Sequence, residues 1–295
     1  MVMMRYCYTA ILALLFLAGS LMAQPNRCTK RTVVGTYAVA AEGMTFMTLE
    51  DGTQMPVPIA SLTVATIYPG GEVSSSGYVA VGDQIMRFGI EPGDPVMSSE
   101  ITVNPNCTGI ENLNSGQIGE LIIQNNGDEI SSIMIQGGPL GSPIITGRWK
   151  RISRAPDGHC PRVNWSHSVG GTYVARSSGI SIIPGVGAAP DALLSRVSIG
   201  YDGTMEAIGT AMPAGTQMPF TIANGAWEEG GLPYTLTFSG TIMAGGMQAM
   251  GDVYYWGVAL DGGNELWSIA LAVPIGNPVA LMTAKRTSRR PTDFE

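Results

Sequence analysis

Two histidines and one cysteine in a short segment are the side chains best suited to bind a metal ion. His159, Cys160 and His167 would present imidazole nitrogens and a thiolate, which zinc and copper accept as ligands. A closed zinc site needs four ligands with regular spacing, and this segment supplies neither the fourth ligand nor the spacing. The sequence therefore predicts no metal site and no cofactor.

Methionines form a second group of potential soft ligands. Met44 and Met47 lie three positions apart, and Met243, Met247 and Met250 form a cluster. Thioether sulfur binds Cu(I), but methionine also fills irregular gaps in hydrophobic cores. These residues fall in segments that we expect to be strands or loops of a β protein, which favours core packing over copper binding.

Candidate catalytic groups are scarce. His159 and His167 are the only histidines and both precede the second half of the chain, which argues against Ser-His and Cys-His catalysis. Glu129 and Glu265 remain as carboxylates for acid and base chemistry, because they occupy corresponding places after two turns. The residue preferences of turns explain the position of these two glutamates better than a catalytic role does. We therefore expect no catalytic residue.

Aromatic side chains are the candidate ligand-binding groups. On a β-strand, Tyr254 and Trp256 share one face while Tyr255 points to the other. Together with Trp227 and Trp267, such rings could line an apolar pocket or stack on a sugar, although large aromatics also fill cores. The sequence indicates Tyr254, Trp256, Trp267 and Trp227 as the residues that would bind a small apolar or sugar-like ligand.

The elements that must position these groups occur twice. VVGTYAVA at 33–40 is echoed by VGGTYVAR at 169–176, NGDEISSI at 126–133 by GGNELWSI at 262–269, and KRIS at 150–153 by KRTS at 285–288. The three motifs keep the same order in both halves. We therefore expect two homologous domains at 24–153 and 169–288, a linker at 154–168, and a flexible tail at 289–295.

Residues 1–23 have the pattern of a secretory signal peptide. One cation, Arg5, precedes an apolar run at 10–18, and Ala23 is a small residue of the kind that signal peptidase accepts. A second apolar stretch, at 266–284, is interrupted by prolines and predicts two strands and a turn. We therefore expect a secreted, periplasmic or cell-envelope protein whose mature chain has no transmembrane segment.

Three cysteines remain after removal of the signal peptide, which takes Cys7 with it. Cys28 and Cys160 precede the two Gly-Thr-Tyr motifs and correspond in the repeat, whereas Cys107 has no counterpart. An odd number in an exported protein leaves one cysteine outside an intramolecular pair. The pattern favours a disulfide between Cys28 and Cys107. The alternative bond, Cys28 to Cys160, would link the entrances of the two domains and stays open.

The chain is acidic and carries few charges. Its formal net charge is −7, and charged residues make up 13% of the sequence, against roughly a quarter in ordinary domains. The acidic balance argues against a nucleic-acid partner. The surface must instead be covered by Ser, Thr, Asn, Gln and Gly, which suits an exported protein.

Short strands separated by turns dominate both halves. Residues 193–201 alternate between apolar and polar side chains, and no segment shows a sustained helical period, so the fold class is all-β. We expect a first strand at 32–40 that is ended by Gly43, and we expect the prolines at 55–58 to exclude a central strand there. Turns are expected at 69–71 and 125–128.

Roughly seven or eight short strands per domain favour two antiparallel β-barrels in tandem. A barrel is preferred because closure removes exposed sheet edges. Two β-sandwiches are the alternative.

The two ends of each domain resemble the calycin arrangement of lipocalins and their relatives. In that family a Gly-x-aromatic motif opens the first strand, and a basic residue on the last strand lies across the aromatic ring and closes the barrel. The matching residues are Gly35, Tyr37 and Arg151 in the first domain and Gly171, Tyr173 and Arg286 in the second. Lipocalins usually have Trp where Tyr stands here, and allene oxide cyclase-like barrels are an equally close comparison. The resemblance implies calycin-like barrels closed by these six residues.

These observations favour a noncatalytic exported protein that binds a small apolar or sugar-like ligand or acts at the cell envelope. One alternative is a cyclase or isomerase that acts by cavity shape, as the resemblance to allene oxide cyclase-like barrels implies. Another is a structural surface protein. An acidic residue in a large apolar cavity would favour the enzyme, a cavity lined by Met, Tyr and Leu would favour binding, and a filled core would favour a structural role.

Overall fold

The computed structural model describes residues 27–48, 51–137, 143–156, 168–183, 185, 187–244, 248–274 and 277–291. The expected signal peptide at 1–23 and most of the expected linker lie outside the described residues. The same holds for His159, Cys160 and His167, and for the last residues of the expected tail.

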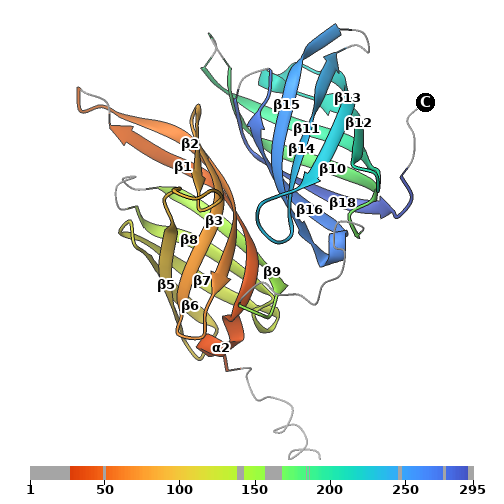
Figure 1. Ribbon diagram of the computed structural model, residues 1–295. Helices are drawn as coiled ribbons and strands as arrows, with labels where there is room; N and C mark the ends of the chain where they lie inside the picture. Colours follow the sequence, from red (N-terminus) through yellow and green to blue (C-terminus); the bar gives the residue numbers. More distant parts are fainter. Residues whose placement is uncertain are drawn as a thin grey trace, which may run out of the picture.

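The chain folds into two closed antiparallel β-barrels in tandem (Figure 1). In the first, called barrel 1, eight strands follow one another and the last pairs with the first. They are β1 (Gly35–Thr48), β2 (Gln54–Ile67), β3 (Glu72–Val81), β5 (Met97–Val103), β6 (Thr108–Leu113), β7 (Gln117–Gln124), β8 (Glu129–Gly137) and β9 (Ile144–Ser153). A ninth strand, β4 (Gln84–Phe88), pairs with one half of β3, and β5 pairs with the other half.

The second barrel, called barrel 2, repeats this plan. Its strands are β10 (Gly171–Ile183), β11 (Gly187–Ile199), β12 (Thr204–Ala211), β13 (Met218–Glu229), β14 (Thr235–Ala244), β15 (Gln248–Leu260), β16 (Glu265–Ala272) and β18 (Leu281–Ser288), with the short β17 (Asn277–Val279) beside β10. Closure of both sheets confirms the tandem barrels that the sequence predicts and excludes the two sandwiches.

Alternating burial explains why these segments form barrel walls. Along β7, buried and more exposed side chains alternate at every position, because successive side chains point to opposite faces of a sheet. The turns between strands lie where the sequence places them. Asn125, Asn126 and Gly127 form the short 3-10 turn η1 (Asn125–Gly127) between β7 and β8, all with positive φ. The expected turn at 69–71 joins β2 to β3.

Two expectations about strand ends were wrong. β1 does not end at Gly43 but continues to Thr48. A Cβ at position 43 would collide with the carbonyl group of Ile144, so the glycine permits the close approach of β9. β2 includes both Pro56 and Pro58. The carbonyl oxygen of Pro58 accepts a hydrogen bond from Gly82 N, on the side away from β1, and β3 pairs with β2 only from Ile59 onward. Pro56 and Pro58, which have no N–H, therefore face an edge of β2 where no strand pairs, and no sheet hydrogen bond is lost there.

The first expected strand also begins later than predicted. Residues Lys30–Val33 form a helical turn, α2, which lies under one end of barrel 1 (Figure 1), and β1 starts at Gly35. A disulfide joins Cys28 to Cys107 and fastens this turn to the loop between β5 and β6. The disulfide expected from the cysteine pattern is confirmed.

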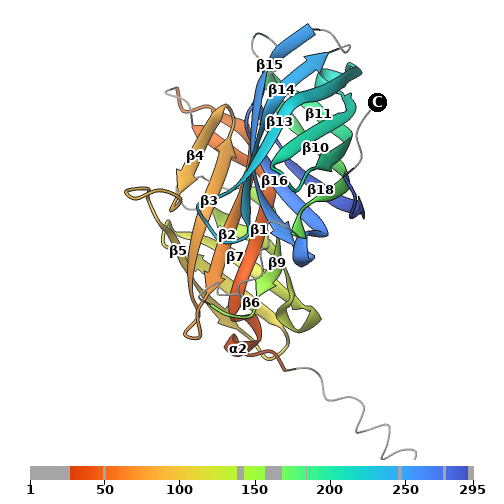
Figure 2. The ribbon, with the colours of Figure 1, turned by 45° about the vertical axis from the view of Figure 1, so that its right-hand side comes forward.

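The two barrels pack against each other through their outer walls (Figure 2). Small outward side chains of β1, β2 and β3 in barrel 1 meet large ones of β15, β16 and β18 in barrel 2. The buried members include Ala38, Ala60, Leu62, Trp256, Trp267 and Ile269. Because Tyr37 and Val39 also point into barrel 1, β1 is buried on both faces.

The apolar stretch at 266–284 lies in strands β16, β17 and β18, which is one strand more than the two expected. None of the helices in the described part of the chain has the length and apolar composition that a membrane crossing would require.

Candidate functional site

Barrel 1 encloses a cavity of about 380 Å³. Its walls are the inward side chains of β1, β2, β3 and β5 to β9, with β4 and the segment before β5 filling the place where β3 and β5 diverge. Branched and aromatic side chains such as Val39, Ile59, Val79, Ile145 and Trp149 make the walls mainly apolar. The cavity occupies the axis of the barrel.

Small polar side chains interrupt the apolar wall. The hydroxyl-bearing members are Ser61, Thr63, Ser75, Ser98, Ser99, Ser115 and Ser132. Glycines at 119 and 147 leave further room, because a residue without a side chain adds nothing to the interior. This composition combines apolar surface with a few hydrogen-bonding groups, the usual lining of a small-molecule site.

One acidic side chain, Glu111 of β6, faces this cavity. The Ser99 hydroxyl donates a hydrogen bond of 2.7 Å to Glu111 Oε1. Burial raises the pKa of the Glu111 carboxyl, and the Ser99 hydrogen bond only partly opposes that rise. The carboxyl group is therefore easier to protonate than an ordinary glutamate.

The closed end of barrel 1 is built around Tyr37 and Arg151. The guanidinium of Arg151 donates to Tyr37 Oη from Nε at 2.9 Å and from Nη2 at 2.6 Å, and its Cζ lies 5.2 Å from the ring centroid. The Tyr37 hydroxyl lies 2.9 Å from Val33 O and 2.8 Å from Gly127 O, so it ties α2 to the η1 turn. Burial raises the pKa of Tyr37 to about 12, partly offset by Arg151.

Barrel 2 carries the same arrangement at its corresponding end. Arg286 Nη2 donates to Tyr173 Oη at 2.9 Å, and its Cζ lies 5.4 Å from the ring centroid. Gly35 and Gly171 start the two first strands with φ of +141° and +143°, and a Cβ on either would collide with a carbonyl group of the last strand. The six residues thus lie where the first and last strands of each barrel pair, and their barrel-closing role stays a prediction.

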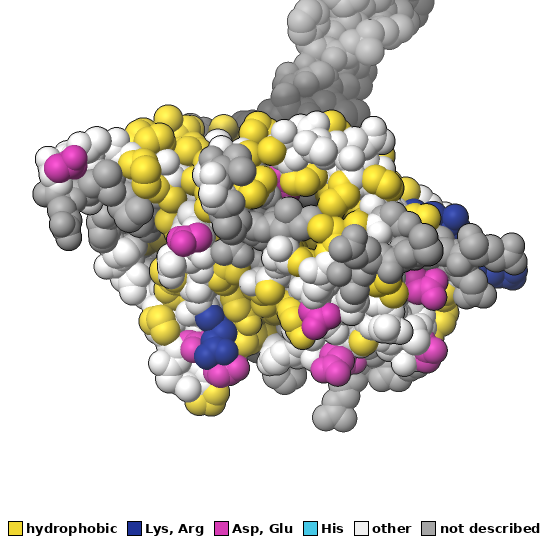
Figure 3. All heavy atoms as spheres, turned by 90° about the horizontal axis from the view of Figure 1, so that it is seen from above, with side chains coloured by type: hydrophobic (Ala, Val, Ile, Leu, Met, Phe, Trp, Pro, Cys, Tyr) yellow, Lys and Arg dark blue, Asp and Glu magenta, His cyan; other side chains and the backbone are white. Residues whose placement is uncertain are grey.

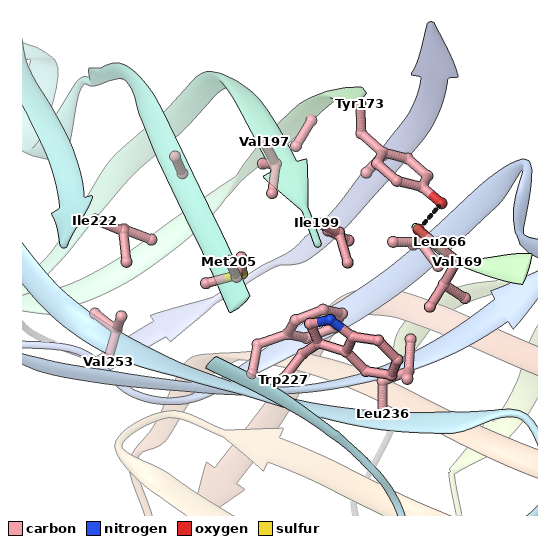
Figure 4. Packing of buried hydrophobic residues seen from close by; sticks show 14 of the residues in the cluster. Val169, Tyr173, Val197, Ile199, Met205, Ile222, Trp227, Leu236, Val253 and Leu266 are labelled. Atoms are coloured by element: carbon pink, nitrogen blue, oxygen red, sulfur yellow. Dashed lines mark hydrogen bonds between the residues drawn. The ribbon is translucent and has the colours of Figure 1, made fainter. Parts of the chain in front are cut away.

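Barrel 2 differs from barrel 1 in its interior, which side chains fill. The two cavities found in it among the described residues measure about 40 and 70 Å³. Figure 4 shows the packing at its closed end, where Trp227, Leu236, Ile199 and Leu266 meet and the Tyr173 hydroxyl reaches Val169. The interior of barrel 1 therefore holds a cavity, whereas the interior of barrel 2 is largely filled by side chains.

The strand registers show which cavity-lining residues of barrel 1 correspond to larger residues in barrel 2. Counting back from the turns η1 and η5 (Asp261–Gly263), Gly119 corresponds to Tyr255, and their cross-strand partners are Glu111 and Phe238. Barrel 2 thus places two aromatic rings where barrel 1 has a carboxyl group and no side chain. On the other walls, Ser61 corresponds to Leu193 and Gly147 to Met282.

The rim of the barrel 1 cavity is apolar and exposed. Met86, Val96 and Ile133 all line the cavity, and their side chains are 41%, 61% and 44% exposed. Figure 3 views the molecule from the end opposite α2, where hydrophobic side chains are spread over the surface among a few acidic and basic groups. An apolar molecule would therefore meet apolar side chains before it enters the barrel.

None of the four predicted ligand-binding aromatics lines this cavity, and only Trp256 and Trp267 share one cluster. Trp256 and Trp267 are buried between the barrels, where Trp256 lies 5.5 Å from the Tyr78 ring and Trp267 lies under Arg148. Trp227 is in the core of barrel 2 and donates to Gly200 O at 2.8 Å, whereas Tyr254 is 48% exposed. Ligand binding by these four side chains stays a prediction.

The other candidates from the sequence occupy ordinary structural places. Glu265 lies at the inter-barrel contact, 2.7 Å from Lys150 Nζ. Burial there raises its pKa, but hydrogen bonds from Lys150 and Trp267 outweigh this and hold the pKa below its usual value. Glu129 is exposed at the start of β8.

No cluster of His, Cys, Asp and Glu suited to a metal ion occurs among the described residues. The side chains of Met47 and Met247 lie outside them.

Sequence reasoning missed Glu111. The segment 108–113 carries no clear alternation, so its inward face was not predicted. The signal that could have found it is the repeat itself, since Glu111 stands where the second copy has Phe238.

No protein-family model matches the chain, and no curated protein matches it. Among solved structures, a mutant of the vaccine antigen Transferrin Binding Protein B from Haemophilus parasuis matches with a TM-score of 0.29 and 7% identity, over 85% of this chain and 76% of that one. A candidate AttH protein from Nitrosomonas europaea matches with a TM-score of 0.25 and 12% identity, over 85% and 92%. A protein of the DUF3598 family from Nostoc punctiforme matches with a TM-score of 0.23 and 9% identity, over 88% and 100%. None of these three is similar enough to carry an argument about function.

Proposed function

We propose that this protein binds a small, mainly apolar ligand inside barrel 1 and that barrel 2 is a filled scaffold that supports it. The observation that carries the proposal is the contrast between a cavity of about 380 Å³ in one barrel and cavities of about 40 and 70 Å³ in its duplicate. Small-molecule sites commonly measure roughly 300 to 1,000 Å³. In this duplicated fold, barrel 2 with its filled interior has a structural role, and barrel 1 with its cavity has the binding role.

The wall of barrel 1 that packs against barrel 2 supports these two roles. Its β1, β2 and β3 are packed inside against the cavity and outside against barrel 2. Lys150 of β9 adds ion pairs to Asp261 at 2.6 Å and Glu265 at 2.7 Å across the contact. A wall held from outside keeps its shape when the interior is empty, so the site is pre-formed.

A second candidate function is acid and base catalysis by Glu111, because an acidic group in an apolar cavity is the feature expected of a cyclase or isomerase. Burial shifts its pKa upward, in the direction that suits a general acid. We favour binding, since the described cavity lining offers no second ionisable side chain to receive a proton. Conversion of a bound ligand by the wild type but not by Glu111→Gln would favour the enzyme.

Export completes the proposal. The disulfide between Cys28 and Cys107 is of the kind that persists in oxidising compartments. Together with the signal-like sequence at 1–23, it supports a secreted, periplasmic or cell-envelope protein. The ligand would then be met outside the cytoplasm.

The test fills the cavity without disturbing the fold. A Cβ at Gly119 meets no atom closer than 3.7 Å, so a Phe there can extend into the open space. We expect calorimetric titration with 1-octanol to show binding to the wild type and at least about tenfold weaker binding to Gly119→Phe. Ile122→Phe, which adds the same ring to the exposed face of β7, is the matched control and should bind like the wild type. Equal binding by all three proteins would refute a ligand site in barrel 1.

A further inference from the structure

We propose that the ligand of barrel 1 is an apolar molecule with a protonated amine, and that Glu111 is the residue that recognises this group. This inference rests on the proposed function and names the chemical class of the ligand. It follows from the position of one carboxyl group, from its hydrogen bonds, and from the character of the surrounding wall.

The first observation is that Glu111 has one oxygen engaged and one turned to the open side of the cavity. Oε1 accepts the hydrogen bond from Ser99. Oε2 lies 3.9 Å from the point where a Cβ on Gly119 would stand, on the side where β7 has no side chain. The strand neighbour that could have covered this oxygen is a glycine, so a ligand group can reach it.

The second observation is that the cavity lining, as far as the structure describes it, contains no countercharge. Apart from Glu111, the described lining side chains are apolar residues, Ser, Thr, Asn and Gln. No Lys, Arg, His or second acid reaches the cavity from any of the nine strands of this sheet. The cation that would pair with the carboxylate must therefore come from the ligand.

The third observation is the duplicate barrel. Phe238 occupies the place of Glu111 in barrel 2, where the interior is filled. A charge in an apolar interior costs free energy unless it is paired, so an acid at this position brings no advantage to packing. The acid occurs in the copy that is open, which ties it to the contents of the cavity.

Amine recognition explains these features together. An ammonium group donates charge-assisted hydrogen bonds to a carboxylate, and these are stronger than bonds between neutral groups. The apolar wall would hold the hydrocarbon part of the same molecule. A ligand with its own carboxylate would instead bring two like charges together.

Three probes with the same hydrocarbon chain separate these cases: octylamine, 1-octanol and octanoate. At pH 8 we expect octylamine to bind the wild type at least about tenfold more tightly than 1-octanol, with octanoate the weakest. In Glu111→Gln, which keeps the shape of the side chain, the preference for octylamine over 1-octanol should fall to within about threefold. Octylamine binding no tighter than 1-octanol in the wild type, or the same preference in both proteins, would overturn the proposal.

The pH dependence gives a second readout. Burial raises the pKa of Glu111, so its carboxylate fraction increases with pH over a range above that of an ordinary glutamate. Octylamine stays protonated up to roughly pH 10, as a lysine does. Its affinity for the wild type should therefore rise with pH through the ionisation of Glu111, and its affinity for Glu111→Gln should stay flat. A flat profile in the wild type would count against recognition by Glu111.

The outcomes distinguish the two proposals. If 1-octanol binds the wild type and is lost in Gly119→Phe, but octylamine shows no preference, the ligand site stands and amine recognition fails. If octanoate binds most tightly, a protonated Glu111 recognises an acceptor and amine recognition also fails. If none of the three probes binds, the proposed function fails with it.

Discussion

Replacing Arg151 with Met tests the closed end of barrel 1 most sharply. The Arg151 side chain is 4% exposed and donates to Tyr37 Oη, to Thr32 O and to Asp128 Oδ1. Methionine would retain an apolar stem but leave these acceptors without their donor. Removing one partner of a buried charged network costs about 3 to 5 kcal/mol. We expect about 3 kcal/mol, because the Asp128 side chain is half exposed and keeps Arg154 as a partner.

Arg154→Met is the matched control. Arg154 Nη2 also lies 2.8 Å from Asp128 Oδ1, but its side chain is 62% exposed, and exposed ion pairs contribute roughly 0 to 1 kcal/mol. Urea unfolding followed by tryptophan fluorescence should show a large decrease in the midpoint of the transition for Arg151→Met and a small one for Arg154→Met. Equal decreases would refute the claim that the buried guanidinium closes the barrel.

Two further predictions concern the contact between the barrels and the alkaline limit of stability. Lys150→Met should destabilise the protein by about 1 to 2 kcal/mol, between the values for exposed and buried ion pairs, because it removes the partner of Glu265. The exposed counterpart in barrel 2, Lys285→Met, should cost less in the same urea experiment, and an equal cost would argue against the bridge. Burial raises the pKa of Tyr37 to about 12, so folding favours the protonated phenol. Its contribution is complete below roughly pH 10 and lost as the pH rises toward about 12. The fall in stability over this range should be smaller in Tyr37→Phe than in the wild type, and identical slopes would contradict the assignment.

Local patterns along the chain were sufficient to predict the fold. The repeated Gly-Thr-Tyr motifs and the turn at 125–128 specify strands and turns through backbone preferences that depend on a few adjacent residues. The alternation around Tyr255 was also right, since this residue lines the interior of barrel 2 while Tyr254 and Trp256 point outward. The prolines of β2 were misjudged because their effect depends on whether the neighbouring strand reaches them, which is a property of the sheet.

The site was harder to predict because it depends on what the two copies do not share. A cavity is left where the inward side chains are too small to meet. Their combined volume depends on strands that are far apart in the sequence. Glu111 and Gly119 become neighbours only through the pairing of β6 with β7. Trp256 and Trp267 were predicted at a ligand site because aromatic rings can line a pocket, but the sequence does not indicate that the wall of another barrel covers them.

The central claim is that barrel 1 is open to a ligand and barrel 2 is not. Native mass spectrometry of the protein purified from its own host tests this most directly, with the wild type and Gly119→Phe compared side by side. We predict that the wild type retains a small molecule and that Gly119→Phe appears at the bare protein mass. A retained molecule of the same mass on both proteins would contradict the claim, because it would place the ligand outside the cavity of barrel 1.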